Sequence, residues 1–316
     1  MGLTDDVLAG DPRAVARAIS MVEDGAEGLE ELSAGVYAHT GRAYTIGLTG
    51  APGVGKSTIA SGLVAAARER DLAVAVLAID PTSPLSGGAL LGDRLRMQVH
   101  ATDPGVFIRS MATRGHLGGM ALAAPEAIRV LDASGRDLVI VETVGVGQDE
   151  VDVAAATDTT LVVVSPGWGD AVQVAKAGIL EIADVFVVNK ADREGAEIAE
   201  RDLRQMLRMG AERPWTPPVI LTTASESEGL DELWAAVESH RAYLGSSGEL
   251  ERGRRDRLLR EVESLALETV RERVRGVLAA DGSLVDDLTA RRTDPYRAAA
   301  ILEGRISDGP KRTQRP

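Results

Sequence analysis

The feature that most constrains the fold of this chain is the octapeptide Gly50-Ala-Pro-Gly-Val-Gly-Lys-Ser57, a full match to the pattern G-x-x-x-x-G-K-[ST]. It stands between an apolar run at 44–49, typical of a buried strand, and a helical pattern at 56–70. A glycine-rich loop that joins a strand to a helix directs backbone N–H groups and the helix dipole at one point. The sequence therefore predicts a phosphate-binding loop within an α/β domain.

Further apolar runs follow this loop at regular intervals and alternate with helical patterns. Such near-continuous Val, Ile and Leu runs indicate strands that are buried on both faces. We therefore expect an α/β fold of the P-loop NTPase type, with a mostly parallel central sheet flanked by helices and helical extensions at both ends. The expected strands are Tyr44–Thr49, Ala73–Ile79, Val106–Arg109, Leu138–Glu142, Thr160–Ser165, Val185–Asn189 and Val219–Thr223.

Three regions can be separated along the chain. Residues 1–43 are predicted to form short helices, one of them capped by Asp11 with Pro12 in its first turn. Residues 44–245 form the P-loop domain, and residues 246–316 form a C-terminal helical arm. The stretch Ser246-Ser247-Gly248 is interpreted as the linker between the last two regions.

The C-terminal arm begins with a long amphipathic pattern. The Arg-rich stretch at 251–275 interleaves acidic residues with its arginines, so it is interpreted as a solvated helix face. An apolar stripe must be buried, either against the chain's own P-loop domain or in a seam with a second copy or a partner. The stripe consists of Leu259, Val262, Ala266, Val270, Val274 and Val277.

Composition excludes several classes of function. The formal net charge of −13 disfavours binding to nucleic acid or to anionic membranes, and we find no basic patch that would overcome it. The chain has no cysteine, which excludes disulfides and thiolate metal sites and suits a reducing compartment. No apolar stretch is long enough to span a membrane, and the first residues do not resemble a signal peptide. We expect a soluble protein of the cytoplasm.

The phosphate loop assigns roles to its own residues. Lys56 is expected to reach the β- and γ-phosphates of a nucleotide, and Ser57 is expected to offer its hydroxyl to Mg²⁺. The residues expected to contact the phosphates are Gly50, Ala51, Pro52, Gly53, Val54, Gly55, Lys56, Ser57 and Thr58.

A second motif, Asn189-Lys190-Ala191-Asp192, follows the expected strand at 185–189. An aspartate can accept hydrogen bonds from both the ring N–H and the exocyclic amine of guanine, while the lysine stem lies along the ring. Adenine lacks this donor pair, and leaving the carboxylate unpaired costs about 1–3 kcal/mol or more. The motif therefore predicts guanine recognition, completed by a backbone N–H from Thr223, Ala224 or Ser225 toward the guanine carbonyl.

Acidic residues at other strand ends indicate a Mg²⁺ site. Glu142 ends one expected strand, and Gly145 follows it in position to sense the γ-phosphate. Asp80 and Asp93 flank a loop rich in Gly, Pro and Ser; they are further Mg²⁺ candidates, although Asp80 could also be a helix cap or turn residue and Asp93 a surface charge. The expected metal set is Ser57, Asp80, Asp93 and Glu142, and the expected catalytic set is Lys56, Asp93 and Glu142. Candidates to assist the attacking water are Asp93, Arg109 and Gln148.

The order of several long strings resembles a known family. GAPGVGKST, IDPTSPLSGGALLGDRLRM, RSMATRGHLGGM, VETVGVGQDEVDV, GDAVQVAKAGILEIAD and NKAD follow one another as in the MeaB/ArgK-type G proteins of the SIMIBI branch, the methylmalonic aciduria type A family. The resemblance covers about residues 10–245 and implies that Lys56 and Ser57 belong to the phosphate loop, that Asp80 and Asp93 belong to the first switch, and that Glu142 is the Walker B acid. It also implies that Gln173 and Lys176 lie in a switch that couples nucleotide state to a partner.

The function implied by this resemblance is that of a GTPase chaperone. Such a protein uses GTP hydrolysis to gate cofactor loading of an adenosylcobalamin-dependent acyl-CoA mutase, chiefly methylmalonyl-CoA mutase, and to protect or reactivate that enzyme. Mg²⁺, GTP and GDP are the expected ligands, and no cobalamin is expected on this chain because the mutase carries it. Homodimerisation through the C-terminal helices is also implied.

Two alternatives stay open. One is a GTPase accessory protein for another metalloenzyme, although such proteins usually carry His- or Cys-rich metal-binding tracts and this chain has four scattered histidines and no cysteine. The other is a kinase of a periplasmic transport-binding protein, which requires a base for the acceptor hydroxyl and a lid that excludes water.

Overall fold

The computed structural model describes residues 2–81, 98–113, 119–143, 149–167, 179–210, 213–280 and 282–307. Within these residues seven strands form one parallel sheet in the order β3-β2-β4-β1-β5-β6-β7. Every apolar run that the sequence analysis singled out is a strand, so the predicted fold class is confirmed. The strands are β1 (Tyr44–Thr49), β2 (Val74–Pro81), β3 (Val106–Thr113), β4 (Leu138–Thr143), β5 (Thr159–Val164), β6 (Val185–Asn189) and β7 (Val219–Thr222).

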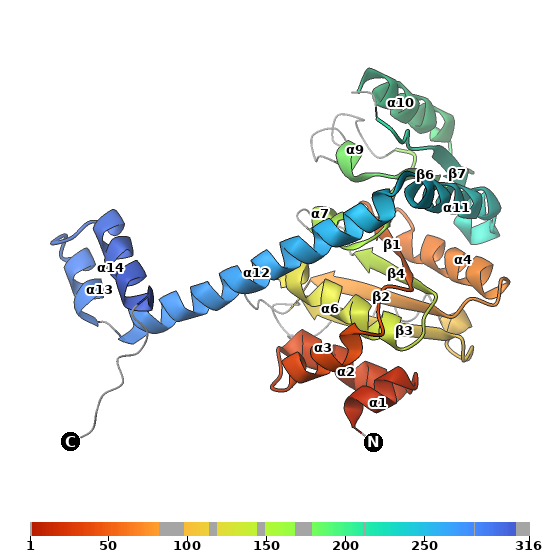
Figure 1. Ribbon diagram of the computed structural model, residues 1–316. Coiled ribbons are helices and arrows are strands. Elements are labelled where there is room, and N and C mark those ends of the chain that lie inside the picture. Colours follow the sequence, from red (N-terminus) through yellow and green to blue (C-terminus); the bar gives the residue numbers. More distant parts are fainter. Residues whose placement is uncertain are drawn as a thin grey trace. The chain divides into compact units, whose positions relative to one another are not determined.

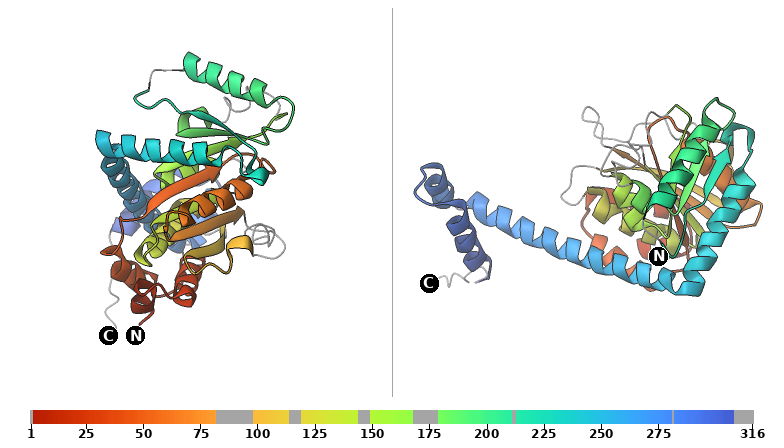
Figure 2. Two further views of the ribbon diagram at one scale, coloured as in Figure 1. Left: turned by 90° about the vertical axis from the view of Figure 1, so that its right-hand side faces the viewer. Right: turned by 90° about the horizontal axis from the view of Figure 1, so that it is seen from above.

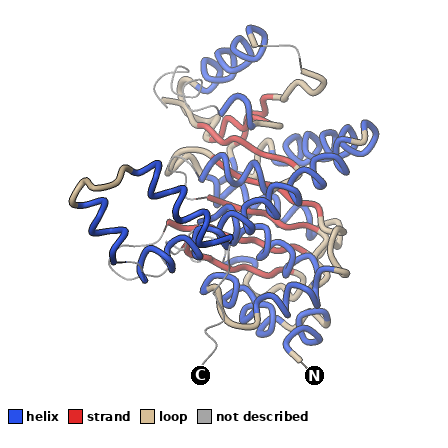
Figure 3. The backbone as a smooth tube through the Cα atoms, turned by 60° about the vertical axis from the view of Figure 1, so that its left-hand side comes forward, coloured by secondary structure: helices blue, strands red, loops and turns tan. Residues whose placement is uncertain are grey.

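Helices cover both faces of this sheet, as Figures 1 and 3 show. On one face α4 (Lys56–Arg68) packs beside α11 (Leu230–Ser247), and on the other α6 (Gly119–Ala133) and α7 (Asp149–Ala156) lie over the strands (Figure 2). The short α9 (Ile179–Ile182) and α10 (Ala196–Met209) cover β6 and β7, and two 3-10 turns, η1 (Gln98–His100) and η2 (Ala224–Glu226), complete the connections.

The pleat of the strands explains why the apolar runs are continuous. Along β2, Val74 and Val76 face the core under α4 and α11, whereas Ala75 and Leu77 face the core under α6. All four side chains are fully buried. Complete burial of one such Val or Leu side chain stabilises the folded state by about 1.5–3 kcal/mol. The same strand therefore stabilises the cores on both faces of the sheet.

Three N-terminal helices add to the core under α6: α1 (Leu3–Leu8), α2 (Pro12–Asp24) and α3 (Leu29–Tyr37). Asp11 caps α2 as predicted, because its Oδ1 accepts hydrogen bonds from the backbone N–H groups of Arg13 and Ala14 at 3.0 and 2.8 Å. Arg109 of β3 also contacts α2. Its guanidinium donates to Ser20 Oγ at 2.7 Å and lies 3.6 Å from the Glu23 carboxylate. Arg109, a candidate for assisting the attacking water, is therefore engaged in attaching the N-terminal helices to the sheet.

The chain divides into two compact units, residues 1–258 and 259–316. Helix α12 (Glu249–Ala280) begins in the first unit and continues into the second, which also holds α13 (Gly282–Thr289) and α14 (Pro295–Ser307). Of the three residues interpreted as a linker, Ser246 and Ser247 belong to α11, and Gly248, with φ 74°, separates α11 from α12. The predicted boundaries at 43/44 and 245/246 stay predictions.

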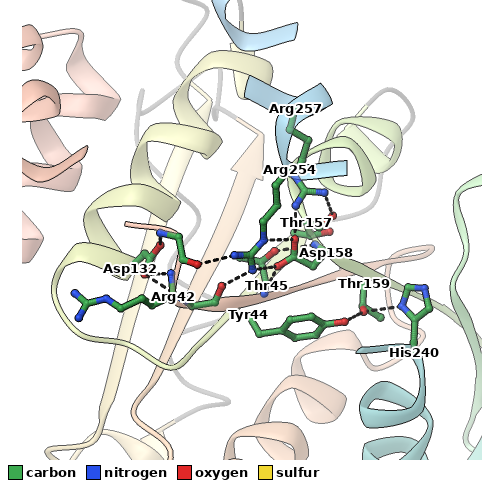
Figure 4. A network of polar contacts seen from close by, with 12 residues as sticks. Arg42, Tyr44, Thr45, Asp132, Thr157, Asp158, Thr159, His240, Arg254 and Arg257 are labelled. Atoms are coloured by element: carbon green, nitrogen blue, oxygen red, sulfur yellow. Dashed lines mark hydrogen bonds and ion pairs between the residues drawn. The ribbon is translucent and has the colours of Figure 1, made fainter. Parts of the chain in front are cut away.

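A buried ion-pair cluster at the amino ends of the strands holds the first turns of α12 (Figure 4). Asp158, whose side chain is only 1% exposed, precedes β5 and pairs with Arg254 and Arg257. Arg254 also donates to the carbonyls of Gly41 and Ala43 at 2.7 and 2.9 Å. The interpretation of 251–275 as a solvated helix face is therefore wrong for these two arginines, which lie within the folded first unit.

The same cluster fixes the charge state of Asp158. Burial opposes ionisation of this carboxyl, but the hydrogen bond from Arg254 and the positive charge of Arg257 outweigh burial and hold its pKa below the usual value. The backbone N–H of Thr45 donates to the same carboxylate at 3.1 Å. We name Asp158, Arg254 and Arg257 the α12 clamp.

No helix in the described part of the chain is both long enough and apolar enough to cross a membrane.

Candidate functional site

The glycine-rich loop follows β1, the central strand at which the chain turns from one half of the sheet to the other. Open parallel sheets bind ligands at the carboxyl ends of the strands near such a point. The loop has backbone angles that only glycine adopts readily, with φ of 139° at Gly50 and 103° at Gly55. A Cβ on Gly50 would lie 2.1 Å from the carbonyl oxygen of Val163 in β5, so the loop lies tightly on the neighbouring strand.

Lys56 begins α4 and lies folded over the loop that precedes it. Its Nζ donates to the carbonyl of Gly50 at 2.7 Å and to that of Ala51 at 3.1 Å, and the residue is only 6% exposed. The ammonium group is thereby held against the loop, at the amino end of a helix of 13 residues. A cation at a helix N-terminus makes a strong anion site, which is the role predicted for Lys56.

Ser57 and Glu142 meet beneath the loop. Ser57 Oγ donates to Glu142 Oε1 at 2.7 Å, and both residues are buried. Glu142 comes from β4, which is paired with β1, and Ser57 lies in the first turn of α4, which follows β1 through the loop. The structure therefore joins two of the four predicted metal-ligating residues in one place.

The Asn-Lys-x-Asp motif lies against the same loop. Asn189 Nδ2 donates to the carbonyl of Val54 at 2.8 Å, and Lys190 Nζ donates to that of Gly53 at 2.6 Å. These two bonds join the end of β6 to the phosphate loop. The distance between the phosphate loop and the Asn-Lys-x-Asp motif is thus set by side chains within the protein.

Asp192 lies in the turn that follows, with its side chain exposed. The turn is fixed by backbone bonds: Ala191 N–H donates to Thr222 O at 3.0 Å, and Arg193 N–H donates to Lys190 O at 3.0 Å. The backbone N–H of Ala224, one of three predicted guanine contacts, donates instead to Asn189 Oδ1 at 3.2 Å. Asn189 therefore connects three segments of the site: the loop, β6 and η2.

Other predicted site residues lie outside the described residues. Asp80 belongs to β2 by its backbone, which is paired with Ala112 of β3, but its side chain is outside the described part. Fully outside are Asp93, Gly145, Gln148, Gln173 and Lys176.

Asn189 is the site residue whose structural role the motif did not reveal. We expect Asn189→Ala to lower the free energy of unfolding by about 2–4 kcal/mol, because Val54 O, Thr222 Oγ1 and Ala224 N–H would lose a buried partner. Nucleotide affinity should fall as well, since the loop loses its brace. Urea unfolding and nucleotide titration would measure both effects.

A matched control for this variant is Thr222→Val. It removes a single hydroxyl that donates to Asn189 Oδ1 at 3.1 Å and preserves side-chain volume, so it should cost only about 1 kcal/mol. Equal stability of the Ala variant and the wild type would contradict the bracing role of Asn189.

Comparisons with known proteins find relatives that are named as GTPases. A protein from Pyrococcus abyssi named as a GTPase is 46% identical to this chain over 313 residues, which cover 97% of each. The GTPase ArgK of Escherichia coli is 36% identical over 272 residues, covering 83% of this chain and 81% of ArgK. The mitochondrial methylmalonic aciduria type A homolog of Caenorhabditis elegans is 38% identical over 221 residues, covering 68% of this chain and 55% of that protein.

A solved structure shares the fold over nearly the full chain. It is described as an LAO/AO transport system kinase, with a TM-score of 0.71, 26% identity and 96% of each chain covered. The family model described as methylmalonyl-CoA mutase-associated GTPase MeaB matches residues 15–279. With its phosphate loop, its Asn-Lys-x-Asp motif and this match, the chain is a P-loop GTPase that belongs to the MeaB family.

Proposed function

We propose that this protein is a Mg²⁺-dependent GTPase that serves as a chaperone for an adenosylcobalamin-dependent acyl-CoA mutase, with methylmalonyl-CoA mutase as the first partner to test. The observation that carries the chemistry is the contact between Ser57 Oγ and Glu142 Oε1 at 2.7 Å beneath the phosphate loop. The partner is supported by the family description and by the names of the relatives.

The residues present fit a Mg²⁺ ion. A hydroxyl and a carboxylate are hard oxygen donors, and this ion prefers such ligands, which usually come from one or two protein groups together with nucleotide phosphates. Ser57 and Glu142 would hold the ion, with Asp80 and Asp93 as further ligands. Bound there, the ion would neutralise charge on the β- and γ-phosphates.

The chain's own residues prepare the site for GTP. Lys56 supplies a fixed positive charge, and the backbone of the loop supplies N–H groups for the phosphates. Asp192 accepts the two guanine donors, and Lys190 spans the space between loop and base. Because the cobalamin is carried by the mutase, this chain needs no site for it.

The first test is GTP and ATP turnover by the purified protein, with and without methylmalonyl-CoA mutase. We expect slow GTP-selective hydrolysis that stops when Mg²⁺ is chelated and accelerates when the mutase is added. GTP turnover that is unchanged by this mutase would contradict the proposed partner but not the GTPase activity. Transfer of phosphate to an acceptor protein would instead favour the kinase alternative.

We further propose that a second copy of this chain covers the apolar face of the second unit. Its α12 segment exposes Leu259, Val262 and Val270 by 58%, 64% and 46%, and these are members of the stripe found in the sequence. Tyr296 of α14 is 89% exposed. Exposed apolar area of this kind marks interaction surfaces, and an amphipathic helix pairs readily with its own copy.

Val262→Glu should therefore convert a dimer into a monomer, because a carboxylate would be buried in the seam. Light scattering coupled to gel filtration would give the mass of each species. Arg275→Glu is the control, since it introduces the same residue on the opposite side of the helix. A monomeric wild type, or a dimer that survives Val262→Glu as well as it survives the control, would count against this surface.

A further inference from the structure

A pocket of about 480 Å³ opens at the amino ends of the strands, whereas the phosphate loop lies at their carboxyl ends. It lies where β5 and β6 begin, between the end of α11 and the start of α12, and all of its lining belongs to the first unit. Its volume falls within the range of small-molecule sites. The family's GTPase chemistry uses the carboxyl ends of the strands and leaves this pocket without a role.

The charged groups around the pocket differ in how they are engaged. Arg257 is bound to Asp158 in the α12 clamp and donates to Thr157 O at 3.0 Å, and Arg213 donates to Leu180 O at 2.9 Å. Asp184 is different: in the described part of the chain the only cationic or ionisable nitrogen within 4 Å of its carboxylate belongs to His240, at 3.4 Å.

His240 does not supply that charge. Its side chain is 3% exposed, and burial lowers its pKa to about 4, against the opposing charge of Asp158. Its Nδ1 contacts Thr159 Oγ1 at 2.8 Å, and Thr159 Oγ1 in turn contacts the hydroxyl of Tyr44 (Figure 4). Burial raises the pKa of Tyr44 well above its usual value, so this chain of groups is neutral near pH 7.

Asp184 thus presents a carboxylate to the pocket without a close countercharge. Its Oδ2 accepts the backbone N–H of Thr160 at 2.8 Å, which fixes its orientation, and its side chain is 31% exposed. Aromatic rings stand beside it. Trp215, whose indole N–H donates to Asp184 O at 2.8 Å, lies 4.8 Å from the His240 ring and 5.2 Å from the Tyr243 ring.

We propose that this pocket binds a small organic cation, an ammonium or guanidinium group on a short apolar stem. The charge is received by the Asp184 carboxylate, and the stem lies along Trp215 and Tyr243. Aromatic faces attract such cations, and a carboxylate without an ion pair gains most from one. Leu244 and Leu250 supply apolar surface for the stem.

Binding should depend on pH in a defined direction. Burial raises the pKa of Asp184 to about 7, although the Thr160 N–H and the charges of Arg213 and Arg257 act against this. The cation requires the ionised carboxylate, so its affinity should increase about tenfold from pH 6 to pH 8. His240 stays neutral over this interval. The remaining titratable groups that line the pocket are Asp158, Glu181, Tyr243 and Glu249.

The test is a titration of the full-length protein with butylammonium chloride, followed by the indole N–H resonance of Trp215, which Trp215→Phe identifies. We expect saturable shifts, about tenfold tighter at pH 8 than at pH 6, and no comparable shifts with the uncharged 1-butanol. Asp184→Asn should lose at least about tenfold in affinity and the pH dependence with it. Glu197→Gln, an exposed carboxylate on α10, is the charge-matched control.

The contribution of the aromatic rings is tested separately by Tyr243→Leu, which should weaken binding about fivefold. Tyr243→Phe retains the ring and should retain the affinity. GTP turnover measured on the same variants should be unchanged, which separates failure of this inference from failure of the proposed function. Equal binding of butylammonium and 1-butanol, retained binding in Asp184→Asn, or absence of any shift in the wild type would each overturn the proposal.

Discussion

Lys56→Ala should reduce GTP turnover by at least about a hundredfold, because the phosphates lose the buried cation that the carbonyls of Gly50 and Ala51 hold in place. The ammonium is directed by the carbonyls of Gly50 and Ala51 at the amino end of α4, so no neighbouring side chain can take its position without rebuilding the loop. Phosphate release under saturating GTP and Mg²⁺ gives the rate, and a fluorescent GTP analogue gives the affinity.

Two further variants sharpen this measurement. Lys56→Arg keeps the charge but replaces a compact ammonium by a planar guanidinium, and we expect it to restore little activity. Arg17→Ala removes an exposed cation from α2 and should leave turnover unchanged. Turnover in Lys56→Ala that equals that of the Arg17 variant would remove Lys56 from the site.

Asp192→Asn should lower GTP affinity by about two orders of magnitude, since two charge-assisted hydrogen bonds to guanine are weakened or reversed. The amide of the new side chain can donate to the carbonyl that xanthine carries in place of the exocyclic amine, so affinity for XTP should rise. Competition among GTP, XTP and ATP for the fluorescent analogue would show this exchange of preference.

The control for base recognition is Glu194→Gln, which removes an exposed carboxylate two residues further along the same loop. This variant should leave the affinities for GTP and for XTP unchanged. An Asp192→Asn protein that still binds GTP as tightly as the wild type would show that the Asn-Lys-x-Asp turn does not recognise the base.

The strands could be predicted because their signal is local. A strand buried on both faces must be apolar at consecutive positions, and the continuous apolar run in 185–189 shows this pattern. The phosphate loop was equally clear, since its glycines and lysine need a fixed spacing. The strand order β3-β2-β4-β1 was not available from the sequence, because strand pairing depends on contacts between residues far apart in the chain.

The errors have physical causes as well. Ser246 and Ser247 are typical of turns, yet α11 continues through them, and both hydroxyls donate back to the carbonyl of Tyr243 within the helix, at 3.1 and 2.8 Å. Arg254 and Arg257 were interpreted as solvated, because an arginine that pairs with a distant buried aspartate has the same local pattern as one in water. Asp184 and His240 gave no signal, since their pocket is formed by segments from separate parts of the chain.

The α12 clamp decides where this protein can be shortened. A protein that ends at residue 245 would contain Asp158 but neither of its arginines, so this carboxylate would lose both of its ion pairs to α12. A protein that ends at residue 258 keeps both ion pairs and the boundary of the first compact unit. The first ten residues of α12 are, in this sense, the last part of the GTPase domain, and a study of that domain in isolation should include them.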